Sequence, residues 1–180
     1  MRSQVRPKKH LGQHFLADDN MAKKIARCID KSDSYLLEIG PGTGNLTKHL
    51  IDTWQDKLWL IEIDKESIEY LHKNLPALSP RIIEGDVLKL DLNTYFGGKP
   101  FSIIGNFPYN ISSQILFKAI EYRSQVIEVV GMFQKEVAKR ICSPPGNKDY
   151  GILSVITQAY FQTSYLFDVP PTVFIPPPCC

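Results

Sequence analysis

The sequence has no long uncharged apolar run and almost no excess of charge of either sign. Its 180 residues carry a formal net charge of +2 and a pI near 8.3. A nucleic-acid surface would therefore have to come from local clustering of basic residues. No segment has the length of a membrane span, and the polar, basic N-terminus lacks the apolar core of a signal peptide. These absences argue against insertion into a membrane and against export.

Cysteine is scarce, and its placement predicts neither a disulfide framework nor a metal site. Cys28 and Cys142 stand alone in helix-like segments, whereas Cys179 and Cys180 are adjacent, and none has the spacing of zinc ligands. A reducing cytoplasm fits this pattern best. The content of 43% hydrophobic and 22% charged residues is typical of one α/β domain with a substantial core.

The chain is organised around residues 35–47, YLLEIGPGTGNLT, where an apolar run and an acid lead into three alternating glycines. The pattern predicts a strand, a tight turn and a helix start, with Gly40, Gly42 and Gly44 letting the backbone pass close beneath a nucleotide-like cofactor. The dinucleotide fingerprint spaces its last two glycines one residue further apart. The E-x-G-x-G-x-G form resembles the first motif of class I S-adenosylmethionine methyltransferases. Alternatively, the glycines serve only the geometry of a turn.

Acidic residues lie at the carboxyl ends of the next two predicted strands, which are LWLIEID and the run around residues 81–84. Glu62 lies roughly 20 residues beyond the glycines, where a carboxylate accepts hydrogen bonds from both ribose hydroxyls of a cofactor. Asp64 is the rival, although it also suits the cap of the following helix. Asp86 is placed to accept an adenine amino hydrogen, and the glycine before it makes a simple turn the alternative.

The most specific stretch is FSIIGNFPYNIS, a predicted strand that ends in Asn106, Phe107, Pro108 and Tyr109. An exocyclic adenine amine is a poor nucleophile because its lone pair is delocalised into the ring, so an enzyme that methylates it needs acceptors around both N–H groups. The Asn106 side-chain oxygen and a carbonyl of Phe107 or Pro108 can supply them. Tyr109 then offers a face for base stacking. The alternative is a proline turn with a buried tyrosine.

Residues 1–20, MRSQVRPKKHLGQHFLADDN, predict a flexible basic arm, and Asp18 or Asp19 can cap a helix over residues 21–29. Nearby phosphates would explain the charge, whereas the alternative is a disordered solvated tail. The basic residues of this arm are Arg2, Arg6, Lys8, Lys9 and His10. In the rest of the chain the patterns predict helices over residues 45–52, 65–75, 112–122, 135–142 and up to 159, a central strand over 126–133, and a last strand in TSYLFDV.

Eight segments together resemble the KsgA-type ribosomal RNA adenine dimethyltransferase family over nearly the whole chain: KKHLGQHFL, EIGPGTGNLT, IEID, GDVLKLD, NFPYNISS, FQKEVAKRI, KDYGILSV and VPPTVFIPPP. The resemblance implies an α/β, Rossmann-like class I methyltransferase fold of three layers with a mainly parallel sheet. It implies S-adenosyl-L-methionine as methyl donor without a metal. It also implies transfer of two methyls to N6 of each of two adjacent adenosines near the 3′ end of small-subunit (16S) rRNA, with the immature 30S subunit as partner in ribosome biogenesis.

The resemblance also assigns site residues. The catalytic set is Asn106, Phe107, Pro108 and Tyr109, with Phe174 opposite Tyr109 as a second stacking face; without the family, Phe174 would be predicted as core. His14 replaces the Asn that is common in the family's GQNFL motif. The predicted cofactor-binding residues are His14, Leu16, Glu38, Gly40, Gly42, Gly44, Glu62, Asp86, Val87 and Asn106.

Members of the family continue into a final sheet strand and a small helical domain, so we interpret the chain as a fragment. We expect an N-terminal arm and helix over residues 1–34, a catalytic domain over 35–176 and a truncated tail over 177–180, in which Cys179 and Cys180 are candidates for foreign residues. The missing strand would leave an open sheet edge, which predicts self-association.

Two other functions stay open. The related family that methylates a large-subunit rRNA adenine and confers antibiotic resistance shares the catalytic motifs. A non-catalytic, RNA-binding assembly factor could keep the same fold, although the intact NFPY and glycine motifs argue against lost chemistry. A small-molecule methyltransferase would leave the basic arm and the stacking aromatics without a partner.

Overall fold

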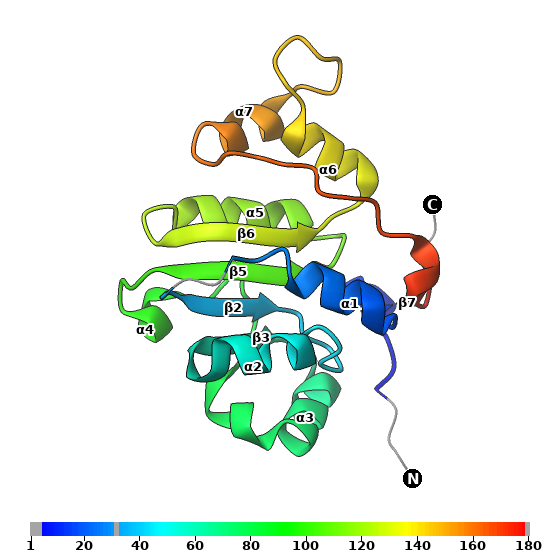
Figure 1. The fold of residues 1–180 in the computed structure, drawn as a ribbon, viewed down its shortest axis with the longest axis vertical. Coiled ribbons are helices and arrows are strands. Elements are labelled where there is room, and N and C mark those ends of the chain that lie inside the picture. The colour runs from blue at the N-terminus through cyan, green and yellow to red at the C-terminus, as the bar shows by residue number, and fades with distance from the viewer. Residues whose placement is uncertain (1–4, 31–32, 179–180) are drawn as a thin grey trace.

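A computed structural model describes residues 5–30 and 33–178, so Arg2, Cys179 and Cys180 lie outside the described residues. Its centre is a five-stranded sheet in the order β4-β3-β2-β5-β6, with every neighbouring pair parallel (Figure 1). The predicted α/β class with a parallel sheet is confirmed. The strands are β2 (Tyr35–Ile39), β3 (Leu58–Glu62), β4 (Ile82–Glu84), β5 (Phe101–Asn106) and β6 (Val126–Met132).

Helices cover both faces of the sheet, which explains why its strands are short apolar runs. Leu36 and Leu37 are adjacent in β2, point to opposite faces and are both fully buried, each in a different core cluster. One face packs against α1 (Asp19–Ala26), α2 (Ile51–Trp54) and α3 (Lys65–Asn74). The other packs against α4 (Asn93–Phe96) and α5 (Ser112–Glu121). The predicted three-layer architecture is thus confirmed.

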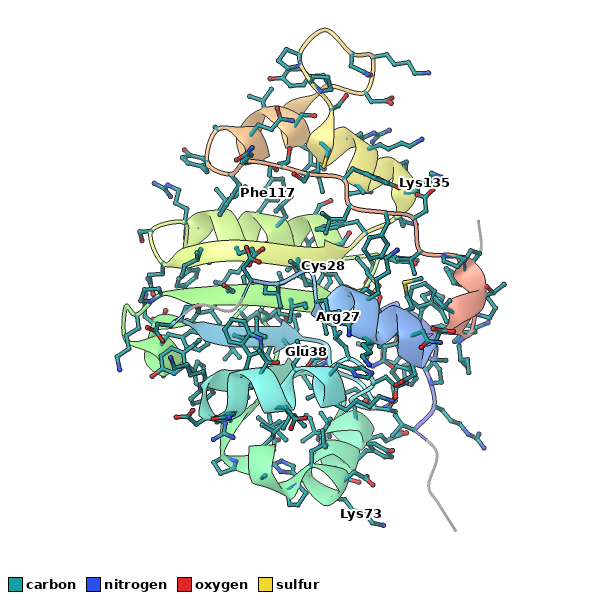
Figure 2. All side chains as sticks on the ribbon, in the orientation of Figure 1. Arg27, Cys28, Glu38, Lys73, Phe117 and Lys135 are labelled. Atoms are coloured by element: carbon teal, nitrogen blue, oxygen red, sulfur yellow. The ribbon has the colours of Figure 1, made fainter. Side chains whose placement is uncertain are left out.

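A helix pair, α6 (Lys135–Cys142) and α7 (Ile152–Gln158), lies beyond α5 and is joined by the loop over residues 143–151 at the top of Figure 1. Leu116, Ile120 and Ile141 form a small third core between this pair and α5. Lys135, labelled in Figure 2, opens α6. No helix among residues 5–30 and 33–178 is long and apolar enough to cross a membrane.

The N-terminal arm lies against the domain, with Val5 buried, although Arg6, Lys9 and His10 are exposed. Its flexibility stays a prediction. After a 3-10 turn, η1 (Lys9–Leu11), strand β1 (Phe15–Leu16) pairs antiparallel with β7 (Phe174–Ile175). Asp18 caps α1, as predicted, by accepting a hydrogen bond from the Met21 backbone at 2.7 Å. The arm, α1 and β7 therefore gather at the carboxyl ends of the parallel strands (Figure 1).

Three predicted elements differ from the structure. The helix expected over 45–52 is replaced by a turn, η2 (Thr47–His49) and the short α2, because the positive-φ glycines turn the chain before a helix can start. The strand expected in TSYLFDV is irregular, since Asp168 is held by side-chain bonds from Lys135 and Tyr165 instead of by a ladder. Strand β6 lies at an edge and not in the centre. The remaining 3-10 turns are η3 (Gln55–Lys57), η4 (Pro76–Arg81) and η5 (Pro171–Val173). The boundary at residue 34 stays a prediction.

Candidate active site

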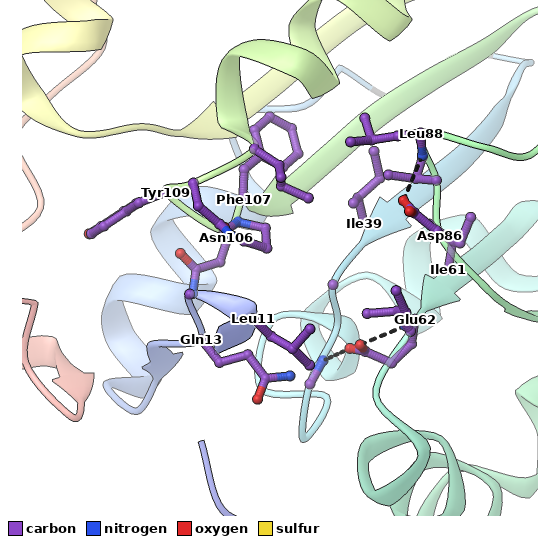
Figure 3. Close-up of a pocket in the computed structure, with 18 of the residues that line it drawn as sticks. Leu11, Gln13, Ile39, Ile61, Glu62, Asp86, Leu88, Asn106, Phe107 and Tyr109 are labelled. Atoms are coloured by element: carbon purple, nitrogen blue, oxygen red, sulfur yellow. Dashed lines mark hydrogen bonds between the residues drawn. The ribbon is translucent and has the colours of Figure 1, made fainter. Parts of the chain in front are cut away.

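A cavity of about 220 Å³ opens where the parallel strands end, with the N-terminal arm as its opposite wall (Figure 3). The carboxyl ends of parallel strands are the usual ligand site of open α/β sheets. Most of the predicted site residues meet here. Those that line the cavity are His14, Gly40, Gly42, Glu62, Asp86, Val87, Asn106, Phe107, Pro108 and Tyr109.

Two of the three motif glycines shape the cavity wall. Gly40 and Gly42 line it with φ of 68° and 55°, whereas Gly44, with φ of 78°, packs against Leu75 outside the lining. Backbone in this region favours glycine because a side chain is strained there. A Cβ on Gly42 would also lie 2.9 Å from the ring of Phe15. The glycine turn therefore lets the arm close tightly over the strand ends.

Replacing Gly42 by alanine is expected to cost more stability than the same change at Gly97, which has a similar φ of 57° but nothing within 4 Å of the added Cβ. The shared backbone strain is about 1–2 kcal/mol. At Gly42 the displaced Phe15 ring adds about 1 kcal/mol more. Urea unfolding of both variants measures the difference, and equal losses would show that the arm tolerates the added methyl.

Glu62 ends β3 inside the cavity, and its carboxylate is held by three backbone amides. Oε2 accepts from Gly42 at 3.0 Å, and Oε1 accepts from Ile63 at 2.9 Å and Asp64 at 3.0 Å. Burial raises the pKa of Glu62, while these three hydrogen bonds pull it down. Figure 3 shows the carboxylate between the glycine turn and its own strand end. The group is fixed in orientation and keeps one acceptor position, on Oε2, for a ligand.

Glu38 does not line the cavity. It lies in β2 (Figure 2) and is 1% exposed, and its Oε2 atom has no hydrogen-bond partner among the residues that the structure describes. Burial raises its pKa to about 8, and the nearby Thr47 hydroxyl lowers it by less. The carboxyl is therefore largely protonated at neutral pH. Its predicted part in cofactor binding stays a prediction.

Asp86 lines the cavity just beyond β4 and is also a turn residue, while its contact with an adenine amine stays a prediction. Its Oδ1 accepts from the Leu88 backbone at 3.0 Å, which makes it a turn residue (Figure 3). The same carboxylate, with buried Val87 beside it, lines the cavity. The carboxylate that stabilises the turn therefore also lines the cavity, next to the apolar side chains of Val87 and Leu88.

Asn106 ends β5, and its amide group is oriented by the arm. Nδ2 donates to the His14 carbonyl at 2.5 Å, so the side-chain oxygen is left as an acceptor. The ring of Phe107 is 1% exposed and packs edge-on against Phe133 at 5.3 Å between centroids. That burial anchors the loop, so only the backbone carbonyl of Phe107 could act as the predicted acceptor.

Tyr109 is half-buried, and its ring is covered by an arm residue. The imidazole of His14 stacks on it with centroids 5.3 Å apart and an interplanar angle of 27°. The His14 Nδ1 atom lies 2.9 Å from the Pro176 carbonyl oxygen. Burial, and then the negative charge of Glu136, raise the pKa of the Tyr109 hydroxyl. His14 thus contacts Asn106 at the end of β5 through its backbone carbonyl, and Tyr109 in the loop that follows β5 through its ring.

Besides Gly44 and Glu38, two further predicted residues, Phe174 and Leu16, lie outside the cavity lining. Phe174 is 3% exposed in β7 and packs in the core beside Leu16, so the structure does not bring it opposite Tyr109. Its residue type alone predicts this core position. Base stacking by the ring stays a prediction, and it would require β7 to move. Leu16 supports the site indirectly, because its carbonyl accepts from Asn45 Nδ2 at 2.5 Å.

Sequence reasoning missed a further set of lining residues. Gly12 carried a signal, since its φ of 62° suits glycine and an added Cβ would lie 2.7 Å from Asn110. The apolar members carried none, because side chains at strand ends look like ordinary core in a sequence. The missed residues are Leu11, Gly12, Gln13, Phe15, Ile39, Ile61, Ile63, Gly85, Leu88, Asn110 and Ile111.

The lining suits a nucleoside with a charged or polar tail. Apolar side chains of Ile39, Ile61 and Leu88 flank a slot whose two carboxylates, Glu62 and Asp86, lie at neighbouring strand ends. Such a pair matches ribose hydroxyls and an adenine amine as donors. Within the described part of the chain, no three His, Cys, Asp or Glu side chains come together as metal ligands would.

Comparisons with known proteins agree with this geometry. A family model described as "Ribosomal RNA adenine dimethylase" matches residues 4–179. Proteins named ribosomal RNA small subunit methyltransferase A from Flavobacterium johnsoniae and Cytophaga hutchinsonii are 56% and 53% identical over 97% of this chain, which spans 67% and 68% of their length.

Two solved structures share the fold. A dimethyladenosine transferase from Plasmodium falciparum is 31% identical with a TM-score of 0.78, over 92% of this chain and 59% of that one. The 23S rRNA methyltransferase ErmE is 27% identical with a TM-score of 0.77, over 92% and 65%. The chain thus spans about two thirds of the curated relatives and less of the Plasmodium protein.

Proposed function

Because the chain belongs to the ribosomal RNA adenine dimethylase family, as its motifs predict, we propose that it methylates small-subunit (16S) rRNA. The reaction transfers methyl groups from S-adenosylmethionine to N6 of two adjacent adenosines near the 3′ end of that RNA during ribosome biogenesis in the cytoplasm. The observation that carries the proposal is the Asn106 amide, fixed by the His14 carbonyl with its oxygen free beside the cofactor cavity.

The cavity residues fit S-adenosylmethionine, which supplies an electrophilic methyl group on its sulfonium when bound. Glu62 would accept the ribose hydroxyls, and Asp86 the adenine amino group. Gly40 and Gly42 line the cavity and would face the ligand with backbone atoms. Gln13 and His14 close the cavity from the arm side. These residues bind and orient the cofactor without taking part in bond making.

The loop from Asn106 to Tyr109 prepares the acceptor base. The Asn106 oxygen and the carbonyl of Phe107 or Pro108 accept both hydrogens of the N6 amine, which draws the nitrogen towards tetrahedral geometry and localises its lone pair. Tyr109 stacks on the base with the ring face opposite to the one that His14 covers. The nitrogen is strongly acidic once it is alkylated, so its proton leaves to water and no side chain of the loop has to act as a base. Catalysis then comes from positioning and from favouring the developing amine geometry.

The small subunit is favoured over the large subunit as target by degree of similarity. The relatives named for the small subunit are 49–56% identical, whereas the 23S rRNA methyltransferase is 27% identical. The non-catalytic role is disfavoured because the Asn106 amide and the Glu62 carboxylate are both held in orientation by hydrogen bonds with the backbone. Which of the two RNAs accepts the methyl group distinguishes the small-subunit activity from the large-subunit activity.

The test is transfer of labelled methyl from S-adenosylmethionine to immature 30S subunits, with 50S subunits as the competing substrate and calorimetry for cofactor binding. Dimethyladenosine formed in 16S rRNA supports the proposal. Label in 23S rRNA would assign the large-subunit activity instead. Cofactor binding without transfer to either RNA would overturn catalysis by this chain and leave an RNA-binding role.

We also propose that β6 mediates self-association, because it lies at the edge of the described sheet and exposes Ile127 at 53%. Unpaired strand edges recruit other strands. Light scattering at rising concentration is expected to show a dimer, and Ile127→Lys is expected to keep the protein monomeric. The exposed Phe117→Lys, on α5, is the control and should leave the dimer intact. A wild-type protein that stays monomeric at high concentration would contradict the proposal.

A further inference from the structure

The arm forms one wall of the cofactor cavity, and only its far end is held by a strand. Residues 11–15 line the cavity. Beyond them, β1 pairs with β7 and Asn45 holds the Leu16 carbonyl. The near end must be fastened by side chains, because the described residues before η1 belong to no strand. The contacts of Lys8 therefore position the near end of the wall, whereas Asn106 holds its middle through the His14 carbonyl.

Lys8 fastens the near end of this wall to the first turn of α3. Its Nζ contacts the Asp64 carboxylate and lies 3.2 Å from Glu66 Oε1. Its backbone nitrogen donates to Gln13 Oε1 at 2.9 Å, which closes the arm into a loop around η1. One residue thus sets both the shape of the loop and its distance from α3.

The partner carboxylate is buried and connects to the predicted ribose site. The Asp64 side chain is 1% exposed and accepts a hydrogen bond from Ser67 at 2.9 Å. Its backbone nitrogen donates to Glu62 Oε1 at 3.0 Å. Burial raises the pKa of Asp64, but the hydrogen bonds from Lys8 and Ser67 bring it below its ordinary value. The carboxylate is therefore ionised, and it depends on Lys8 for an opposite charge.

We propose that Lys8 is a positioning residue of the cofactor site, which holds the wall of residues 11–15 closed over the ligand through its ion pair with Asp64. An ion pair between two exposed groups would contribute little. Here one partner is buried, so loss of Lys8 leaves a buried carboxylate without its ammonium and frees the near end of the wall. The choice of S-adenosylmethionine as the ligand rests on the proposed function, whereas the fastening of the arm does not.

Two measurements on the 180-residue chain test the proposal with Lys8→Met, Lys8→Arg and the control Lys9→Met. Lys9 is the exposed neighbour, so its replacement removes the same charge one residue away. Calorimetry with S-adenosylmethionine is expected to give a Kd about tenfold higher for Lys8→Met. Lys8→Arg, which keeps the ion pair, and Lys9→Met are expected to stay within about twofold. Hydrogen exchange without ligand is expected to show faster exchange at residues 11–15 in Lys8→Met only.

The outcomes separate this proposal from the proposed function. A wild-type chain that does not bind S-adenosylmethionine would count against the cofactor assignment, yet the exchange comparison would still decide whether Lys8 holds the arm. Equal exchange at residues 11–15 in the wild type and Lys8→Met would overturn the proposal whatever the binding result. Equal loss of affinity in Lys8→Met and Lys9→Met would also overturn it, because general charge would then explain the effect. A drop in thermal stability of Lys8→Met that Lys8→Arg fails to restore would assign Lys8 to folding alone.

Discussion

Replacement of Asn106 by alanine is expected to lower the rate of methyl transfer about a thousandfold while cofactor affinity changes by less than about threefold. The Asn106 oxygen accepts its hydrogen bond in full only as the N6 nitrogen becomes tetrahedral. Removal of one such transition-state contact typically lowers the rate of the chemical step about 10²–10³-fold. Single-turnover transfer to immature 30S subunits, at saturating S-adenosylmethionine, measures the chemical step directly.

Two further variants show which contact of Asn106 causes the loss. Asn106→Asp keeps the acceptor oxygens but cannot donate to the His14 carbonyl, so it separates acceptance from the arm contact made by Nδ2. Asn74→Ala, at the exposed end of α3, removes an amide bonded only to a helix carbonyl and should transfer at the wild-type rate. If Asn106→Ala retains more than about a tenth of the rate, the amide is not the orienting group and the backbone carbonyls of the loop must suffice.

The strands of the fold were predictable because a buried parallel strand has a local signature. Strands β2, β3, β4 and β5 each lie within one residue or two of the predicted run, since each is a short apolar segment between helix-forming stretches. TSYLFDV has the same apolar character, yet Leu166 is 59% exposed and the segment lies outside the sheet. Strand formation requires a partner edge, which a local pattern does not reveal.

The strand-end part of the site was also predictable, because topology alone brings the ends of neighbouring parallel strands together. Glu62, Asp86 and Asn106 therefore meet although they are far apart in the chain. The position of the arm was not predictable. Its contacts, such as His14 on Tyr109, join segments about 95 residues apart through single side chains that leave no periodic trace.

The position of Phe174 shows the limit of inference from a motif. A motif fixes residue type and order, whereas side-chain orientation depends on packing of β7 against the arm. In this structure the ring fills the core beside Leu16, and His14 covers Tyr109. The departure of His14 from the common GQNFL motif lies at that very contact. An imidazole in place of a shorter amide gives Tyr109 an aromatic neighbour from the arm.

Replacement of Glu62 by glutamine is expected to weaken S-adenosylmethionine binding at least about a hundredfold. The carboxylate accepts three backbone N–H groups, and an amide NH₂ in the same place would face one of these donors. One buried donor left unsatisfied costs about 1–3 kcal/mol of stability in the free and the bound protein alike. Loss of the charged acceptor costs binding about 1.5–3 kcal/mol per hydrogen bond from a ribose hydroxyl, and the roughly 2.8 kcal/mol that a hundredfold change in Kd requires lies within reach of one or two such bonds.

The control for this variant lies directly across the sheet. Glu84 is paired with Glu62 in the register of β3 and β4, but its side chain is exposed, so Glu84→Gln should bind the cofactor as the wild type does.

Because burial raises the pKa of Glu62, wild-type affinity should fall as the pH is lowered through that pKa, since the ionised form is the acceptor. Glu62→Gln has no such proton to gain, and its weak binding should not follow this pH dependence. Calorimetry across acidic pH checks both, and a wild-type curve that is as flat as that of Glu62→Gln would remove Glu62 from the ribose site.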